Sequence, residues 1–223
     1  MGGRYRPWVA AAAALVASAV GYQVGVRPRM YFWGATGEEV IEGLPGDELV
    51  DSDGPRTTRA VTVHAPPEAV WPWLAQIGED RGGFYSYSAL ERAVGADIHN
   101  AATIHPQWQH LQVGDTVWLA RRGGERGRLV VAAIQPGSHL VLMSPEDFDR
   151  VQRGELASGS WAFHLRPDGS STRLLARGNG GYGGNPIYDI AHFVMERKML
   201  DGIRRRAERS ASEISPPSAA RSG

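Results

Sequence analysis

Side chains that can do chemistry gather in the middle of the chain, over residues 81–102. Tyr85, Tyr87 and His99 stand out among them. A histidine changes protonation near neutral pH and can carry a proton, and a tyrosine hydroxyl can hydrogen-bond an enolate. If they line one cavity, these residues predict general acid–base chemistry.

The same stretch also has a structural interpretation. Ser88 and Glu91 have the spacing of a capping box for a helix over residues 89–94, and Gly95 is the expected end of that helix. Asn100 can satisfy backbone groups of the loop through a local turn. We therefore expect residues 81–102 to form the rim of a ligand site, and both interpretations of its reactive side chains stay open.

Metal binding is disfavoured by the spacing of the possible ligands. His99, His105 and His110 lie close in sequence, with Glu91 and Asp97 nearby. Imidazoles and carboxylates can bind zinc or iron, but the spacing is not that of a metal motif on a helix. We expect no metal.

A glycine run near the end of the chain resembles a dinucleotide motif. Gly178, Gly180 and Gly183 spell G-x-G-x-x-G after a strand and before a helix. The preceding strands are expected to form hairpins and no strand follows the helix, so the required βαβ unit cannot form. We expect no cofactor and interpret the run as a connection beside a ligand opening, where Tyr182 can act as a gate.

Composition limits the class of protein. The 223 residues suit one domain, and 42% of them are hydrophobic, which is enough for a core. Equal numbers of basic and acidic residues, 24 of each, argue against a nucleic-acid partner. The absence of cysteine excludes disulfides and thiolate zinc sites.

Residues 1–28 are expected to form an apolar helix. No residue from Pro7 to Val26 is charged, and about 20 apolar residues are the length that spans a bilayer. The favoured interpretation is an uncleaved single-pass anchor, which predicts a membrane location. One alternative is a signal peptide cleaved after Ala17-Ser18-Ala19, which predicts export, and another is a surface helix.

Residues 29–57 are expected to connect this helix to the domain. The segment is rich in acidic residues, and Thr36 and Glu39 form a capping box for a short helix. The composition favours a solvated linker. Its first residues, Met30 to Trp33, are apolar enough to pack on the domain or at a bilayer surface.

The domain is expected over residues 58–209, followed by a disordered tail at 210–223. Alternation of apolar and polar residues predicts a strand at residues 59–65, and helical spacing predicts a helix from Pro67 to Ile77. A long helix, from about Pro186 to Arg209, closes the domain. The later strands, joined mostly by short turns, are expected at residues 116–120, 128–135, 139–144, 160–166 and 172–177. This order predicts an α+β fold in which a curved antiparallel sheet grips the closing helix.

The order of elements and several stretches resemble the SRPBCC superfamily, which has the START-like, helix-grip fold. The similarity is nearest to a bacterial subfamily of polyketide cyclase/dehydrase type that often carries an apolar amino-terminal segment. The matching stretches are WGATGEEV (33–40), LPGDELV (44–50), APPEAVWPWLAQIGEDRGGFYSYSALE (65–91), GADIHNA (95–101) and VGD (113–115). Lipid and sterol carriage, plant hormone binding and aromatic cyclisation all occur in that superfamily, so the resemblance implies a fold rather than one function.

The leading hypothesis is a domain at a membrane that binds a small hydrophobic molecule, lipid-like or aromatic, between the sheet and the closing helix. The expected ligand-binding residues are Phe84, Tyr85, Tyr87, His99, Asn100, Trp118, Trp161, Phe163, Tyr182 and Phe193. Trp71, Trp73 and Met195 are candidates for the lining or the core. The alternative is a cyclase/dehydratase-type enzyme in which His99, Tyr85 or Tyr87 acts as acid or base.

Overall fold

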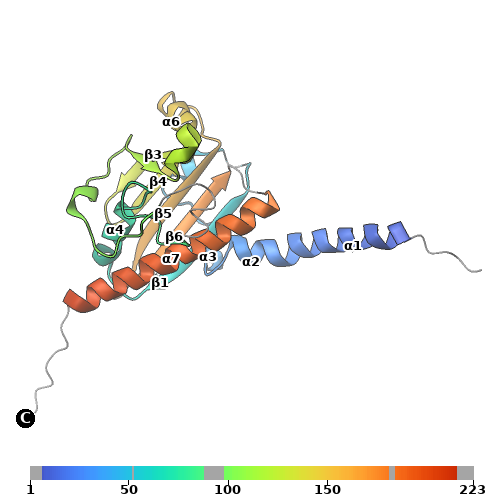
Figure 1. Ribbon diagram of the computed structural model, residues 1–223, viewed down its shortest axis with the longest axis horizontal. Helices are drawn as coiled ribbons and strands as arrows, with labels where there is room; N and C mark the ends of the chain where they lie inside the picture. Colours follow the sequence, from blue (N-terminus) through green and yellow to red (C-terminus); the bar gives the residue numbers. More distant parts are fainter. Residues whose placement is uncertain (1–6, 52, 88–97, 181–183, 215–223) are drawn as a thin grey trace, which may run out of the picture.

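The centre of the fold is a six-stranded antiparallel sheet with the strand order β1-β6-β5-β4-β3-β2. We describe it from a computed structural model that covers residues 7–51, 53–87, 98–180 and 184–214. The strands are β1 (Arg56–Val63), β2 (Thr116–Trp118), β3 (Arg128–Gln135), β4 (His139–Met143), β5 (Gly159–Asp168) and β6 (Ser171–Gly180). The predicted strands and hairpins are confirmed, and the first strand pairs with the last (Figure 1).

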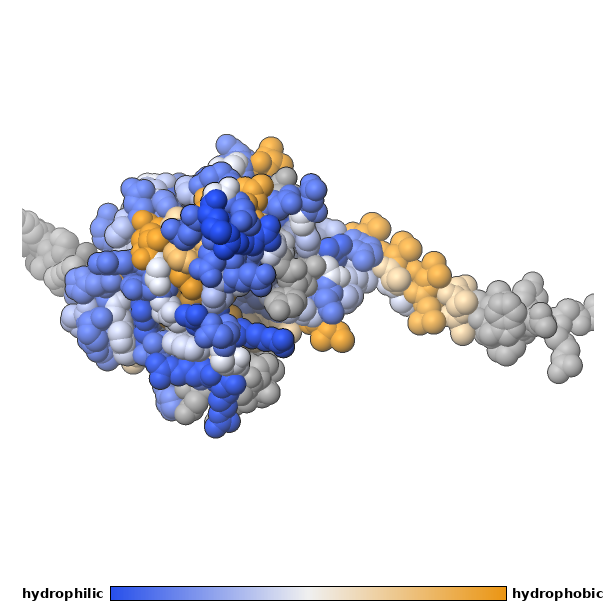
Figure 2. Space-filling view, turned by 90° about the horizontal axis from the view of Figure 1, so that it is seen from above, coloured by the Kyte–Doolittle hydropathy of each residue, from blue (hydrophilic) through white to orange (hydrophobic). Residues whose placement is uncertain are grey.

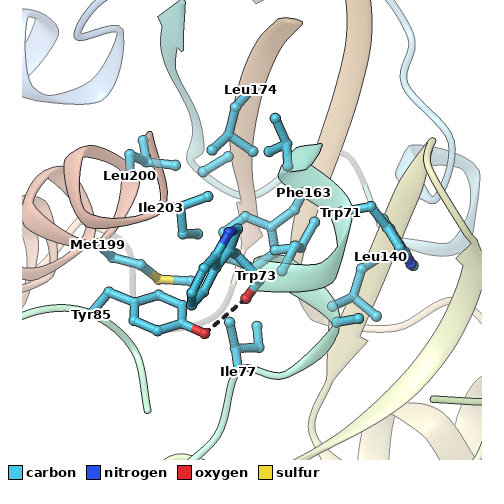
Figure 3. Close-up of a cluster of buried hydrophobic side chains, with 14 of the residues drawn as sticks. Trp71, Trp73, Ile77, Tyr85, Leu140, Phe163, Leu174, Met199, Leu200 and Ile203 are labelled. Carbon is cyan, nitrogen blue, oxygen red and sulfur yellow. Dashed lines mark hydrogen bonds between the residues drawn. The ribbon is translucent and has the colours of Figure 1, made fainter. Parts of the chain in front are cut away.

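One face of the sheet packs against helix α7 (Pro186–Ile214). Alternation along the strands directs Phe163 of β5 and Leu174 of β6 to this face, where they meet Leu200 and Ile203 of α7. Helix α4 (Pro67–Ala75) adds Trp73 to the same core (Figure 3). Sheet and closing helix together make the predicted α+β helix-grip fold. The helix continues to Ile214, so the prediction that it ends near Arg209 was wrong, and residues 215–223 of the predicted tail lie outside the described residues.

A glycine lets α7 approach the loop after α4. A Cβ atom on Gly202 would lie 2.5 Å from the carbonyl oxygen of Tyr85 and 2.7 Å from its Cβ atom. We therefore expect Gly202→Ala to lower the free energy of unfolding by about 1–2 kcal/mol, because overpacking outweighs the helix propensity of alanine. Urea unfolding measures this. In the control variant Gly37→Ala, the new Cβ meets no atom within 4 Å, and unchanged or higher stability is expected. A higher urea midpoint for Gly202→Ala would contradict the packing argument.

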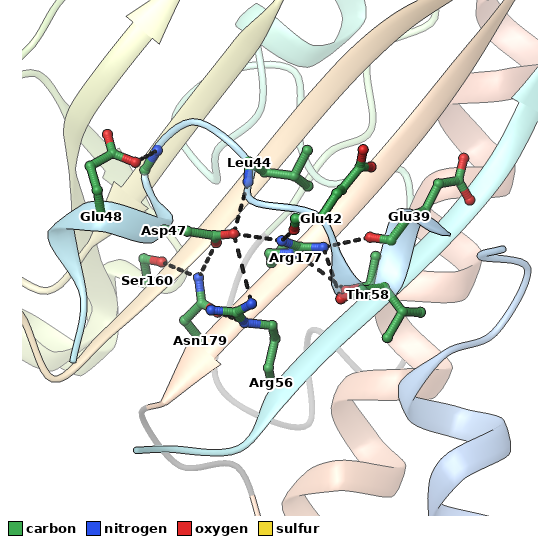
Figure 4. Close-up of polar contacts among 12 residues, drawn as sticks. Glu39, Glu42, Leu44, Asp47, Glu48, Arg56, Thr58, Ser160, Arg177 and Asn179 are labelled. Carbon is green, nitrogen blue, oxygen red and sulfur yellow. Dashed lines mark hydrogen bonds and ion pairs between the residues drawn. The ribbon is translucent and has the colours of Figure 1, made fainter. Parts of the chain in front are cut away.

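The opposite face of the sheet is covered by the connector, which contains α3 (Gly37–Ile41) and η2 (Asp47–Leu49). Arg177 of β6 is fully buried there and donates hydrogen bonds to the carbonyl oxygen of Glu39 at 2.6 Å and to the carboxylate of Asp47 at 2.5 Å (Figure 4). Arg173 binds the side chain of Glu39, which also closes the predicted capping box with Thr36. The interpretation of this segment as a solvated linker was wrong, because Glu39 and Asp47 pair with Arg173 and Arg177 on one face of β6.

The amino-terminal region is helical and leads away from the sheet (Figure 1). Helix α1 (Pro7–Gly21) continues through a π-helical turn, η1 (Tyr22–Val26), into α2 (Arg27–Tyr31). Side chains from residue 11 to residue 21 are exposed, with Leu15 at 73%, and Figure 2 shows apolar side chains around this projection. None of the helices in the described residues has both the length and the apolar character needed to cross a membrane.

The remaining elements lie between the strands. They are η3 (Pro106–Trp108), η4 (Arg121–Gly127) and α6 (Pro145–Gln152). Sequence periodicity did not reveal α6, which is short and largely polar. Its start is nevertheless well marked, because the side chain of Ser144 accepts a hydrogen bond from the backbone of Asp147. The helix predicted over residues 89–94, with its capping box, lies outside the described residues.

Candidate functional site

Tyr85 is the most constrained of the predicted site residues. Its hydroxyl donates to the carbonyl oxygen of Trp73 at 3.1 Å and accepts from the side chain of Gln76 at 3.0 Å. Its backbone has a φ of 56°, and its N–H donates to the side-chain oxygen of Asn100 at 2.5 Å. Burial raises the pKa of the Tyr85 hydroxyl to about 12. Tyr85 and Asn100 therefore hold the loop together through a contact that spans 15 positions of the chain.

The other two predicted acid–base residues lie at the surface. His99 is exposed. Tyr87 is 44% exposed, with the amino group of Lys198 5.4 Å from the centre of its ring. Tyr85, by contrast, is buried and engaged. In the described part of the chain, the three residues thus occupy different environments and do not line one cavity together.

A buried ion pair lies beneath the first half of α7. Arg59 of β1 and Glu196 of α7 approach to 2.5 Å, and both side chains are 1% exposed. The Nε atom of Arg59 donates to the carbonyl oxygen of Met30 at 2.7 Å. The second carboxylate oxygen of Glu196 accepts from the indole N–H of Trp161 at 2.6 Å. The pair thus joins the N-terminal region, β1, β5 and α7 at one point.

His192 extends this cluster towards the surface, with 27% of its side chain exposed. The guanidinium of Arg59 lies 3.1 Å from Nδ1 of His192. Because a guanidinium only donates hydrogen bonds, Nδ1 must accept, and the proton of the neutral ring must sit on Nε2. Burial lowers the pKa of His192, and the charge of Arg59 lowers it further against the opposing effect of Glu196. His192 is therefore a neutral ring, and its Nε2 atom lies 3.8 Å from the second carboxylate oxygen of Glu196.

Aromatic rings surround His192. We call Phe84, Trp161, Phe163, Tyr188 and His192 the aromatic cluster. Tyr188 stacks on His192 with 5.5 Å between ring centres, and Trp161 meets His192 edge-on at 6.0 Å. Trp161 also contacts Phe163 at 4.7 Å and Phe84 at 6.1 Å. Flat aromatic faces gathered around one partly exposed polar ring can hold a planar, largely apolar molecule.

The remaining predicted ligand residues are spread over the fold. Phe193 packs against Trp33, with 6.3 Å between ring centres. Trp118 lies on β2, three strands from β5, under the guanidinium of Arg121. Tyr182 lies outside the described residues. Trp71 and Trp73 belong to the core.

Sequence reasoning missed four residues of the site: Arg59, Tyr188, His192 and Glu196. Two signals were available. Arg59 has the same strand parity as the buried Val61 and Val63, which places a charge on the core face. His192 and Glu196 are four residues apart and so share one side of α7.

A polar pocket of about 290 Å³ lies elsewhere, next to η3. It is lined by Asp80, Arg81, Gln107, Trp108, His110, Leu111 and Asp115. Its charged walls do not suit an apolar ligand. The described residues contain no group of three or more histidine, aspartate or glutamate side chains placed to hold a metal ion.

Comparisons with known proteins give only a general likeness. No family model and no curated protein matches the sequence. Among solved structures, a protein of Nitrosomonas europaea is 12% identical, covers 75% of this chain and 99% of its own, and has a TM-score of 0.47. The self-sacrificing resistance protein CalC of Micromonospora echinospora is 11% identical over 75% of this chain and 100% of its own, with a TM-score of 0.40. The Aha1 dimer of Colwellia psychrerythraea is 13% identical over 72% and 99%, also with a TM-score of 0.40. The helix-grip assignment therefore rests on the strand order and on α7 across the sheet.

Proposed function

We propose that this chain is a helix-grip domain of the SRPBCC type that binds a small, largely apolar, planar molecule at the aromatic cluster. The observation that carries the proposal is His192, a partly exposed neutral ring between Trp161 and Tyr188. The neighbouring rings supply the apolar contact area.

The ion pair beneath the cluster supports this assignment. Burying two charges costs several kcal/mol per ion, and an apolar pair of similar size often gives equal or higher stability. Arg59 and Glu196 instead position the site. Arg59 fixes the tautomer of His192, and Glu196 fixes the ring of Trp161 by a hydrogen bond.

We expect Trp161→Leu to reduce the fraction of protein that carries a ligand by roughly tenfold, because the ligand loses its main aromatic wall. The measurement is native mass spectrometry of the full chain, released from detergent micelles after incubation with a membrane lipid extract. The full chain is needed because Met30 and Trp33 pack on the domain. Trp118→Leu is the matched control, since Trp118 lies on the far edge of the sheet. Equal retention by both variants, or no retained molecule in the wild type, would count against the proposal.

We further propose that the N-terminal helix holds the protein at a membrane. The support is the run of 20 uncharged residues from Pro7 to Val26 and the exposure of its apolar side chains from residue 11 to residue 21. We expect the expressed chain to sediment with membranes after a carbonate wash, and the double variant Val16→Asp/Val20→Asp to move to the soluble fraction. Intact mass tests the alternative, because loss of the first 19 residues would identify a cleaved signal and export. An uncleaved wild-type chain found in the soluble fraction would contradict both.

A further inference from the structure

A group of polar contacts joins the N-terminal region to the start of α7. The hydroxyl of Tyr31 donates to the carboxylate of Asp189 at 2.8 Å. It also accepts from the backbone N–H of Gly184 and from the guanidinium of Arg27, each at 3.0 Å. The other oxygen of Asp189 accepts from the N–H of Gly184 at 3.1 Å. The hydroxyl thus connects α2, the loop before α7 and the first turn of α7.

These contacts lie in a dry environment. Asp189 is 3% exposed, and burial raises the pKa of the Tyr31 hydroxyl. The guanidinium of Arg27 lies over the ring of Tyr31 at 4.6 Å and within 3.8 Å of Asp189. Tyr22 adds a longer hydrogen bond to Asp189 at 3.4 Å. Hydrogen bonds shielded from water hold their partners more firmly than exposed ones do.

The same short segment also reaches the aromatic cluster. Met30, next to Tyr31, offers its carbonyl oxygen to Arg59, and Arg59 binds both His192 and Glu196. Residues 27–31 therefore contact α7 directly at Asp189 and, through Arg59, two further positions along the helix. A shift of this segment breaks both connections at once.

In the described part of the chain, no apolar side chain of the first half of α7 is fully buried. Ile187 is 82% exposed and Ile190 is 45% exposed. The second half is different, because Met199, Leu200 and Ile203 are buried in the core. Segments with few buried apolar contacts open at a lower free energy than the core does. The polar contacts of Tyr31 and Arg59 therefore carry much of the attachment of residues 186–196.

We propose that Arg27–Tyr31 is a clasp that holds the first three turns of α7 closed over the aromatic cluster, and that displacement of this segment opens the site. This inference rests on the proposed function for what enters the site, but the opening itself is a property of the chain. Helix α1 runs directly into the clasp through the π-helical turn (Figure 1). A displacement of α1 is thereby transmitted to the contacts that hold the start of α7.

Hydrogen–deuterium exchange of the full chain tests the clasp without a ligand. Tyr31→Phe removes the bridging hydroxyl, and Asp189→Asn removes the charge that it binds. In both variants we expect exchange of residues 186–196 to rise about tenfold, as for the loss of one buried hydrogen bond, with β5 and β6 unchanged. Asp201→Asn is the control, because Asp201 lies on the same helix but pairs only with Arg204 and Arg205 among the described contacts. Unchanged exchange at 186–196, or an equal rise throughout the domain, would overturn the proposal.

A second measurement separates this proposal from the proposed function. Stopped-flow fluorescence measures how fast the dye Nile red binds to and leaves the wild type and the variants. Only the part of the fluorescence signal that disappears in Trp161→Leu is assigned to the aromatic cluster. We expect Tyr31→Phe to speed both association and dissociation of the dye by roughly threefold or more, because the start of α7 opens more easily. If hydrogen exchange of residues 186–196 is faster in Tyr31→Phe but the dye kinetics are unchanged, the segment does not control access to the aromatic cluster. If no variant shows a Trp161-dependent signal, the binding function fails, and hydrogen exchange alone decides whether the clasp exists.

Discussion

Replacement of Arg59 by methionine is expected to lower the free energy of unfolding by about 3–5 kcal/mol, the cost typical of stranding a buried charge. Arg59 and Glu196 are both 1% exposed, so the carboxylate left behind has no access to water. His192 loses the donor to its Nδ1 atom, and the carbonyl oxygen of Met30 loses its partner. Urea unfolding followed by circular dichroism measures the loss.

Two comparisons show whether the stranded charge is the cause. The double variant Arg59→Met/Glu196→Gln removes the charge but keeps an acceptor for Trp161, so we expect it to be more stable than Arg59→Met alone. Arg128→Met is the surface control, because Arg128 pairs with Glu125, whose side chain is 76% exposed. Such exposed pairs contribute about 0–1 kcal/mol. If Arg59→Met costs no more than Arg128→Met, the ion pair does not organise the site.

Local patterns in the sequence were sufficient for the sheet. Alternation of apolar residues and turn signals predicted the strands, and the short connections predicted the antiparallel hairpins. The capping box at Thr36 and Glu39 is a local signal of the same kind, and α3 begins there. Each of these features is decided by residues a few positions apart.

The site depends on pairs that are distant in sequence. Arg59 and Glu196 are separated by 137 positions, and Arg177 and Asp47 by 130. Composition alone makes the acids of the connector look solvated, because nothing near them in the sequence reveals the arginines on β6. The reactive residues 81–102 drew attention by their type, yet Tyr85 proved to be a structural anchor. Residue type suggests chemistry, but only the tertiary partners of a side chain decide it.

His164 should make the protein less stable in acid. It lies on β5 at 3% exposure, on the face covered by the connector, and its Nε2 atom has no hydrogen-bond partner in the described part of the chain. Burial lowers the pKa of His164 to about 4, and the nearby charges of His139 and Arg177 add to the effect. The folded protein therefore resists protonating this ring, whereas the unfolded chain takes up the proton below about pH 6.5.

The sign of the effect follows from this difference in proton binding. Between pH 6.5 and pH 4 the unfolded state binds more protons than the folded state, so the free energy of unfolding falls as the pH falls. The stability is complete above pH 6.5, and about 3 kcal/mol of it is lost by pH 4. Urea unfolding at a series of pH values from 7.5 to 4 measures the slope.

The variant His164→Gln should flatten that slope whatever its stability at neutral pH, because glutamine has no proton to gain. His99→Gln, which changes an exposed histidine, should keep the wild-type slope. Parallel curves for the wild type and His164→Gln would show that other groups cause the acid sensitivity. The groups around the ring show where the stability is lost: His139, Arg177 and Arg166 favour the neutral ring, whereas Asp47 favours the protonated one. Because Asp47 and Arg177 also attach the connector to the sheet, acid should release the connector before it disrupts the core under α7.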